Sequence, residues 1–216
     1  VAMIDFDGDA LPDLGRFEFG NWQVRRNLGC EHDDNFDEVA CSFSAPTHVG
    51  GASKRPLEDL RMMDVTGNGR ADLVYEVDST WRLYETDGES WSGGSIVPGS
   101  SGVPLHESTM KYADINGDGR TDVIRPGGRG LFVQFATEDG FDDGHSLGPI
   151  SEESGYVDLG QPNLRFTDVN GDGLADAVWM SDYWMKPFFG RGDGTFVDGQ
   201  KWDYRNDDTS FGQSGI

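Results

Sequence analysis

Apolar and polar side chains alternate in many short stretches of the chain, for example in residues 22–24, 81–83 and 164–166. A period of two is typical of half-buried β-strands, whereas an amphipathic helix repeats every 3.6 residues. No window has the helical period. Gly, Asn and Asp, which favour tight turns, separate the stretches. The pattern therefore predicts an all-β protein built of short strands.

Four nine-residue segments, here called the first to fourth acidic loops, align without gaps. They are residues 5–13 (DFDGDALPD), 64–72 (DVTGNGRAD), 114–122 (DINGDGRTD) and 168–176 (DVNGDGLAD). Their starts are 59, 50 and 54 residues apart, and apolar stretches recur around each loop in the same order. A repeat of this length with four strands is typical of a β-propeller blade, whereas a solenoid of β-sheets usually has shorter repeats. We expect one domain with blades at approximately residues 1–58, 59–108, 109–162 and 163–216.

Side-chain oxygens recur at positions 1, 3, 5 and 9 of each loop, and the backbone carbonyl of position 7 is a further donor. Many hard oxygen donors on a flexible loop favour Ca²⁺ over Mg²⁺. No loop has the Glu at position 12 that an EF-hand requires. We predict up to four calcium ions; the alternative is four turns that bind no metal. The candidate ligands are Asp5, Asp7, Asp9, Leu11, Asp13, Asp64, Thr66, Asn68, Arg70, Asp72, Asp114, Asn116, Asp118, Arg120, Asp122, Asp168, Asn170, Asp172, Leu174 and Asp176.

The four loops are not equivalent. Position 6 is Gly in the second, third and fourth loops, where it permits a positive φ, but it is Ala10 in the first. An Ala at positive φ costs roughly 1 kcal/mol. The second loop has Thr66 and Asn68 between its two aspartates, so we expect it to bind calcium most weakly.

The formal charge of −22 makes nucleic acid an unfavourable partner, because phosphates and the 39 acidic side chains repel each other. Aromatic residues make up 12% of the chain, which argues against a disordered acidic segment. No apolar run approaches the ~20 residues of a membrane helix, so we expect no membrane insertion. The chain begins with Val1 rather than Met, and we expect a mature or excised segment of a longer protein.

Two cysteines, Cys30 and Cys41, are separated by ten residues. They are too few for a four-ligand zinc site, and no nearby histidine completes a known spacing. A disulfide across a short hairpin is the favoured interpretation, with two small buried thiols as the alternative. A disulfide indicates a secreted, extracellular protein.

The six tryptophans are candidates for stacking on sugar rings, but we expect most of them to pack between blades. Trp184 and Trp202 have polar neighbours, so we expect these two to be exposed and to bind a ligand. The many carboxylates include close pairs of the kind used in glycoside hydrolysis, but nothing distinguishes a catalytic pair. We therefore assign no catalytic residue.

At the acidic loops the sequence resembles the FG-GAP/VCBS repeat family, and the resemblance covers nearly the whole chain. In that family a D-x-[DN]-x-[DN]-G-x-x-D loop joins the first two strands of a propeller blade and holds calcium, as in integrin α-subunits. Residues 22–29 and 43–46 look like bacterial VCBS blades. Family propellers usually have seven blades, so the four here imply either part of a larger ring or a closed four-bladed ring. A partial ring needs further blades from the parent chain or a second copy to cover its edges.

VCBS blades occur in secreted lectin-like proteins, polysaccharide-degrading enzymes and the propellers of Rhs- and Tc-type toxins. The resemblance therefore implies a secreted, calcium-stabilised interaction module that binds a glycan or a protein without catalysis of its own. The alternatives are part of a polysaccharide-degrading enzyme of the lyase type, and a propeller segment of a toxin shell. Fold alone does not decide among them.

Overall fold

The computed structural model describes residues 2–18, 21–32, 39–49, 60–127, 130–147, 150 and 159–203. These residues form strands and turns without a helix. The described part of the chain therefore contains no helix that could cross a membrane. The all-β prediction is confirmed. Each acidic loop joins the first two strands of one antiparallel sheet, as the repeat indicated.

Four sheets correspond to the four repeats, with the strands of each blade in sequence order. Blade 1 contains β1 (Ala2–Ile4), β2 (Asp13–Glu18), β3 (Asn21–Arg25) and β6 (Thr47–Val49); blade 2 contains β7 (Leu60–Met63), β8 (Asp72–Val77), β9 (Thr80–Thr86) and β10 (Trp91–Ile96). Blade 3 contains β11 (Lys111–Ala113), β12 (Asp122–Gly127), β13 (Gly130–Gln134) and β16 (His145–Ser146); blade 4 contains β17 (Leu164–Thr167), β18 (Asp176–Met180), β19 (Trp184–Gly190), β20 (Phe196–Asp198) and β21 (Trp202–Asp203), of which β20 and β21 both pair with β19. Two small hairpins, β4 (Asn27–His32) with β5 (Val39–Phe43) and β14 (Ala136–Thr137) with β15 (Gly140–Phe141), are inserted into blades 1 and 3.

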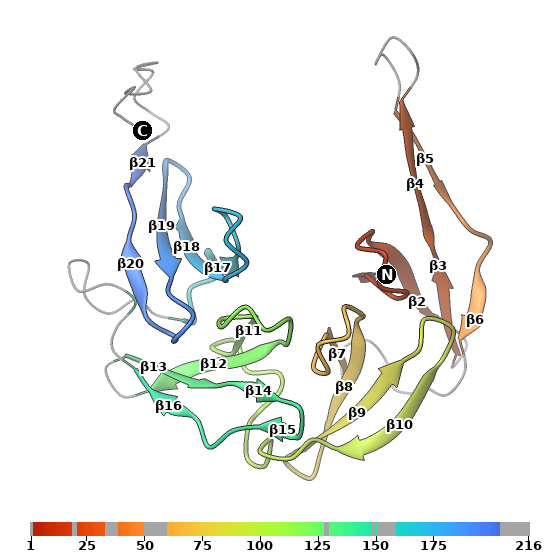
Figure 1. The fold of residues 1–216 in the computed structure, drawn as a ribbon, viewed down its shortest axis with the longest axis horizontal. Helices are drawn as coiled ribbons and strands as arrows, with labels where there is room; N and C mark the ends of the chain where they lie inside the picture. Colours follow the sequence, from red (N-terminus) through yellow and green to blue (C-terminus); the bar gives the residue numbers. More distant parts are fainter. Residues whose placement is uncertain are drawn as a thin grey trace.

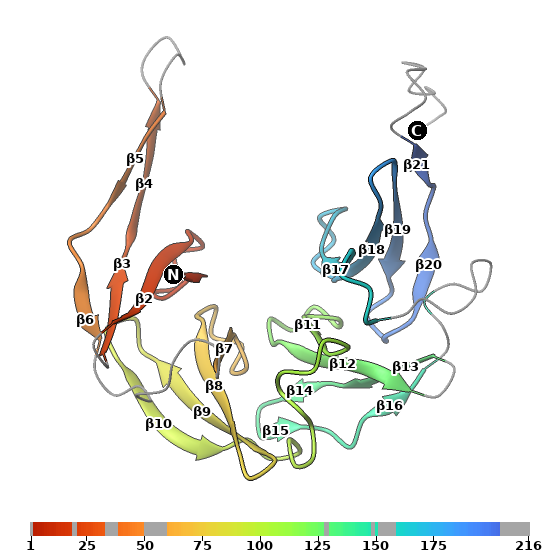
Figure 2. The same cartoon turned by 180° about the vertical axis from the view of Figure 1, so that it is seen from behind.

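The blades follow one another along an arc, with the innermost strands β1, β7, β11 and β17 on its concave side (Figures 1 and 2). Three apolar clusters fill the spaces between consecutive blades. Between blades 1 and 2, the ring of Trp91 makes edge contacts with Phe6 at 4.8 Å and with Trp22 at 5.5 Å between centroids. Each such fully buried side chain contributes roughly 1.5–3 kcal/mol, so these clusters hold the blades together.

The arc is open between its two end blades in the described part of the chain (Figure 1). Val169, at position 2 of the fourth loop, is 46% exposed, whereas its counterparts Phe6, Val65 and Ile115 are buried between blades. At the other end, Met3 on β1 is 69% exposed. The described residues therefore form a four-bladed propeller arc and not the closed four-bladed ring that was one of the two alternatives. Continuation of the arc by further blades stays a prediction.

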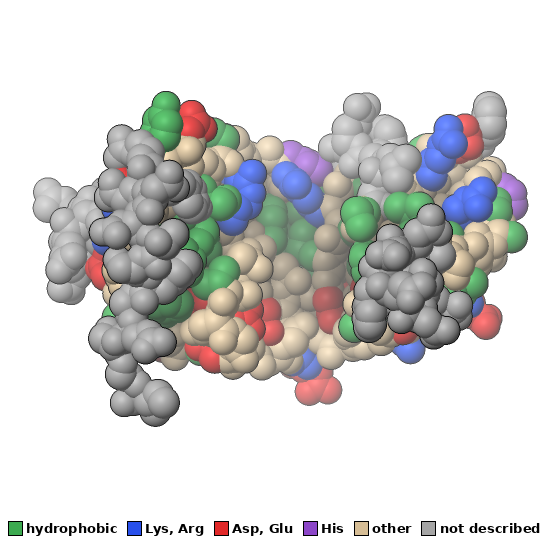
Figure 3. Space-filling model, turned by 90° about the horizontal axis from the view of Figure 1, so that it is seen from above, with side chains coloured by type: hydrophobic (Ala, Val, Ile, Leu, Met, Phe, Trp, Pro, Cys, Tyr) green, Lys and Arg blue, Asp and Glu red, His purple; other side chains and the backbone are tan. Residues whose placement is uncertain are grey.

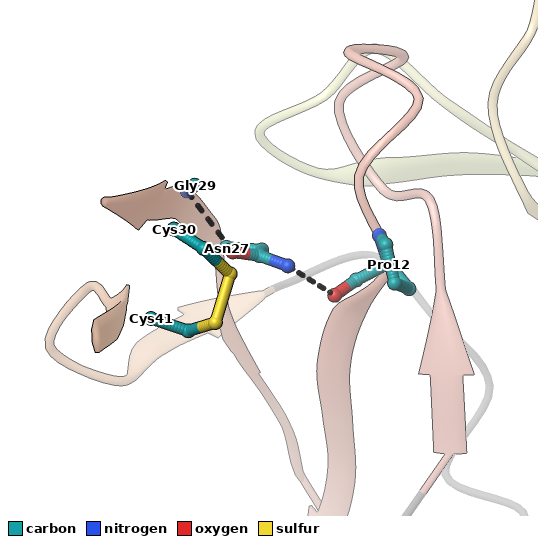
Figure 4. Close-up of a disulfide and its surroundings, with 5 residues drawn as sticks. All are labelled: Pro12, Asn27, Gly29, Cys30 and Cys41. Carbon is teal, nitrogen blue, oxygen red and sulfur yellow. Dashed lines mark hydrogen bonds between the residues drawn. A yellow bond between two sulfur atoms is a disulfide. The ribbon is translucent and has the colours of Figure 1, made fainter. Parts of the chain in front are cut away.

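The disulfide between Cys30 and Cys41 is confirmed, and it links directly opposed residues of the β4–β5 hairpin (Figure 4). The base of this hairpin contacts the first acidic loop. The Asn27 side-chain amide donates to the carbonyl of Pro12 at 3.3 Å, and the amide of Gly29 donates to the Asn27 side-chain oxygen at 3.0 Å. The inserted hairpin explains why the first repeat interval is the longest.

Candidate metal centre and aromatic patch

The aspartate at position 1 organises each acidic loop. Its Oδ1 accepts a hydrogen bond from the amide of position 4, and its Oδ2 accepts one from the amide of position 6; in the third loop Asp114 accepts from Gly117 at 2.7 Å and Gly119 at 2.8 Å. The same pair of bonds occurs in the other three loops. In the fourth loop these bonds lower the pKa of Asp168. A carboxylate held by backbone amides keeps its charge and fixes the loop around it.

Two positions of each loop adopt a left-handed backbone. Position 6 has φ between 78° and 85° in the three loops with Gly, as predicted, and Ala10 adopts φ 66° in the first loop. Position 4 also has positive φ in every loop, which the sequence analysis did not identify. A Cβ atom at Gly8 would lie 3.1 Å from Cγ of Arg70 in the next loop, so this glycine also permits close packing of neighbouring loops.

Backbone hydrogen bonds connect each loop to the next. The amide of position 8 donates to the position 1 carbonyl of the preceding loop: Ala71 to Asp5 at 2.7 Å, Thr121 to Asp64 at 2.6 Å and Ala175 to Asp114 at 2.9 Å. The Arg70 guanidinium adds a hydrogen bond to the carbonyl of Asp7 at 3.0 Å. The four loops therefore form a continuous row along one rim of the arc.

The aspartate at position 9 is fully buried in all four loops: Asp13, Asp72, Asp122 and Asp176. In the third loop, Asp122 Oδ2 accepts from the amide of Ile115 and Oδ1 from the amide of Ala136, both at 2.8 Å. Equivalent bonds occur in the other blades. Burial raises the pKa of Asp72 to about 6 and that of Asp122 to about 7. This residue thus fastens the loop to the end of the third strand or to the segment directly after it, a role that its place in the motif does not reveal.

The first loop brings three carboxylates together. One oxygen each of Asp5, Asp7 and Asp13 lie within 4.8 Å of one another. Oδ1 of Asp7 is buried and lacks a hydrogen-bond partner, while its Oδ2 lies 3.4 Å from Nε of Arg26. An unpartnered buried carboxylate oxygen is costly. A hard divalent cation would satisfy this oxygen, so the donor set of the first loop fits calcium.

Position 3 differs in the other loops. Thr66 Oγ1 is within hydrogen-bond distance of Asp64 and Asp72, at 3.4 and 3.2 Å. The amides of Asn116 and Asn170 donate to the position 5 aspartates at 3.2 and 2.9 Å. Position 5 of each loop also accepts from the amide of position 7. Among the described residues, Asp5, Asp7 and Asp13 are the acidic groups close enough to share an ion, and Asp9 is not part of this set.

The predicted ligand-binding tryptophans both lie at one edge of blade 4, on β19 and β21. Because Trp184 pairs with Asp203 and Met185 pairs with Trp202, the two indole rings lie on opposite faces of these strands. Trp202 is 50% exposed and pairs with Met185, the neighbour of Trp184 on β19. The expectation that both tryptophans are exposed is wrong for Trp184, which is partly buried because it packs edge to face on Trp179 at 5.3 Å and lies under the ammonium group of Lys201 at 4.5 Å. Tyr183, which the sequence analysis did not single out, is 54% exposed beside them. We call Tyr183, Trp184 and Trp202 the aromatic patch.

A cavity of about 330 Å³ lies between blades 2 and 3. Its lining combines the carboxylates of Glu85, Glu138 and Asp139 with the hydroxyls of Thr66, Ser95 and Thr137. Sequence reasoning did not find this cavity, because its walls come from separate repeats.

Comparison with known proteins supports the repeat and the fold. Residues 64–124 match the model of the FG-GAP-like repeat, which confirms the resemblance for that segment. None of the curated proteins compared with the chain matches it significantly. The chain superposes on the Tc holotoxin pore of Photorhabdus luminescens with a TM-score of 0.56 at 15% identity, covering 94% of this chain and 12% of that one. It superposes on a lectin of Agrocybe aegerita, described as recognising non-reducing terminal N-acetylglucosamine, with a TM-score of 0.51 at 20% identity, covering 95% and 51%. The chain thus spans about half or less of these solved structures.

Proposed function

We propose that the chain is a secreted, calcium-stabilised propeller module that binds a glycan through the aromatic patch of blade 4. The proposal has two parts. Calcium holds the acidic rim of the arc, and exposed aromatic side chains contact the ligand. The disulfide supports an extracellular location, since such bonds persist in oxidising compartments.

The calcium part rests on the first acidic loop. Asp5, Asp7 and Asp13 would hold the ion, with the Asp7 oxygen that lacks a partner as a ligand. Bound calcium would neutralise charge in a chain of net −22 and would satisfy that oxygen. The third and fourth loops supply carboxylates and amide oxygens, and the second supplies the fewest charges, so we expect affinity to fall in that order.

The glycan part rests on one observation, the exposure of Trp202 and Tyr183 at the edge of blade 4. Aromatic rings with a polar atom and an apolar face suit sugars, which present C–H groups and hydroxyls together. A protein ligand is the other candidate, since tryptophan and tyrosine are also enriched at protein interfaces. We favour a glycan because the carboxylates of Asp182 and Asp203 flank the rings and can accept hydrogen bonds from sugar hydroxyls.

A glycan array probed with the calcium-loaded protein tests the assignment. We expect binding that disappears with Trp202→Ala. Phe43→Ala is the matched control, because Phe43 is an exposed aromatic residue on the β4–β5 hairpin. Binding that survives Trp202→Ala, or that both variants abolish equally, contradicts the assignment to the aromatic patch.

A second candidate is a propeller segment of a large toxin shell. It is favoured by the superposition of 94% of the chain on the Photorhabdus luminescens toxin pore. A parent gene several times longer than this chain, combined with an array that shows no glycan binding, would favour this function over the first.

A further inference from the structure

Basic residues recur at one position of the innermost strands. The residue three before each loop's first aspartate is Arg61, Lys111 and Arg165 in blades 2, 3 and 4, and Ala2 in blade 1. Only 17 of the 216 residues are Lys or Arg, against 39 Asp and Glu. Three cations at one repeat position therefore stand out from the acidic background.

Strand register places these cations away from the acidic loops. Arg61 pairs with Val74, Lys111 with Ile124 and Arg165 with Val178, so each lies toward the end of its strand farthest from the loop. At 3.3 Å per residue, each is ~10 Å from the first aspartate. Figure 3 looks into the hollow of the arc and shows Lys and Arg toward one rim of the inner wall and Asp and Glu toward the other.

The three cations belong to neighbouring strands. The guanidinium of Arg61 lies 5.7 Å from the ring centroid of Tyr112, the residue next to Lys111. Strand β11 contacts β17, which carries Arg165. We call Arg61, Lys111 and Arg165 the basic rim.

The two arginines of the basic rim retain donors for a ligand, whereas Lys111 donates to the carbonyl of Ser108 at 3.5 Å. Arg61 and Arg165 are exposed, and neither forms an ion pair with a carboxylate of the described residues. Arg165 donates instead to the carbonyl of Leu164 at 3.0 Å and to that of Pro162. Packing on Tyr112 is one role of Arg61, but it leaves the guanidinium donors available to an anion.

The aromatic patch lies on the same rim. Strand β18 ends at Met180, whose amide donates to the carbonyl of Asn163 at 3.1 Å, two residues before Arg165. The β18–β19 turn follows, with Tyr183 and Trp184 at its end. Stacking surfaces and cations are therefore combined at the rim opposite the acidic loops.

We propose that this rim binds an acidic glycan, with sugar carboxylates on the basic rim and sugar rings on the aromatic patch. The inference rests on the proposed function and adds the class of its ligand. Arginine favours carboxylates because its planar donors match two oxygens. The net charge of −22 opposes any long polyanion, so the proposal commits to a short acidic glycan that contacts the basic rim locally; a nucleic acid could also use cations and stacking and is one outcome of the test.

Calorimetric titration of the calcium-loaded chain tests this. The probes are hexagalacturonic acid, neutral chitohexaose, a heparin-derived hexasaccharide and a six-residue oligothymidylate, all at fixed free calcium. We expect the galacturonate to bind tightest, and the double variant Arg61→Gln with Arg165→Gln to lose about tenfold or more in affinity. Arg16→Gln, which removes an exposed arginine of blade 1 that is paired with Glu18, is the control and should bind as the parent does.

The variants separate the two proposals. Arg61→Lys with Arg165→Lys keeps the charge but loses the paired donors, so its affinity should fall between those of the parent and the Gln variant. An unchanged melting temperature of each variant confirms folding. Equal binding of chitohexaose and galacturonate, both lost with Trp202→Ala, overturns the acidic class but keeps the glycan site. A preference for the heparin fragment overturns the assignment to sugar carboxylates, because sulfate groups then dominate recognition. A preference for the oligothymidylate, or galacturonate binding that the Gln variants leave unchanged, overturns the acidic-glycan site. Absence of binding to all four probes overturns both proposals.

Discussion

The buried aspartate at position 9 accepts backbone hydrogen bonds with both of its side-chain oxygens. In the third loop, the two oxygens of Asp122 accept hydrogen bonds from buried backbone amides. One amide belongs to Ile115 in the same loop, and the other belongs to Ala136, just after β13. Asp122→Ala leaves two amides without acceptors, so we expect a loss of about 2–4 kcal/mol of unfolding free energy. Asp122→Asn retains one acceptor and should lose less. Urea denaturation measures both, with the exposed Asp139→Ala as a control that should change little.

Ala10 carries a backbone strain that glycine relieves. Its φ of 66° lies in the left-handed region, where the other three loops have glycine. We expect Ala10→Gly to stabilise the protein by up to about 1 kcal/mol. The reciprocal change, Gly173→Ala, should destabilise it by a similar amount. Thermal melts of both variants in calcium check this, and a lower melting temperature for Ala10→Gly would refute the strain.

The raised pKa values of two buried aspartates predict a pH dependence without calcium. Burial raises the pKa of Asp72 to about 6 and that of Asp122 to about 7, whereas the ordinary pKa of an aspartate is 3.8. The folded state therefore binds protons more readily, and this contribution to stability is complete below about pH 4 and is lost as pH rises through 6 to 7. In chelator, the melting temperature should fall between pH 5 and pH 8. Asp72→Asn with Asp122→Asn should flatten the profile; an unchanged slope contradicts the assignment.

At the scale of elements, the β4–β5 hairpin is a local addition to blade 1. Its disulfide closes a short loop between directly opposed strands. Loop entropy predicts that Cys30→Ser with Cys41→Ser lowers the unfolding free energy by roughly 2–3 kcal/mol. Hydrogen exchange should show faster opening in residues 27–32 and 39–43 and unchanged protection in blade 4. Equal loss of protection in blade 4 would mean that the hairpin supports the whole arc.

The strand pattern and the spacing of acidic loops were sufficient to predict four blades and the left-handed conformation at position 6, and the number and spacing of the cysteines favoured the disulfide over two free thiols. These features depend on neighbours in the sequence. The links from Ala71, Thr121 and Ala175 to the preceding loops depend on contacts between repeats, so the motif alone could not reveal them. The cavity between blades 2 and 3 also depends on contacts between repeats. The hydrogen bonds by which the position 9 aspartate fastens its loop to a later part of the same blade likewise depend on contacts outside the motif.

At the scale of the whole molecule, the arc has opposite charges on its two rims. Carboxylates gather where the acidic loops form a row, and cations gather at the other end of the innermost strands. Like charges in the row repel each other at neutral pH, while the inter-blade clusters and loop-to-loop hydrogen bonds hold them close. A cation on this rim would therefore strengthen the contacts between blades.

The thermal midpoint with and without calcium tests that claim most directly. One site at calcium one hundred times its dissociation constant adds about 2.7 kcal/mol. For a domain of this size that corresponds to a rise of about 5–11 °C. We expect such a rise when calcium is added to chelator-treated protein at pH 7.5, a smaller one with magnesium, and a reduced one in Asp7→Asn. A midpoint that calcium leaves unchanged, in protein shown by elemental analysis to be metal-free beforehand, contradicts a calcium-stabilised propeller.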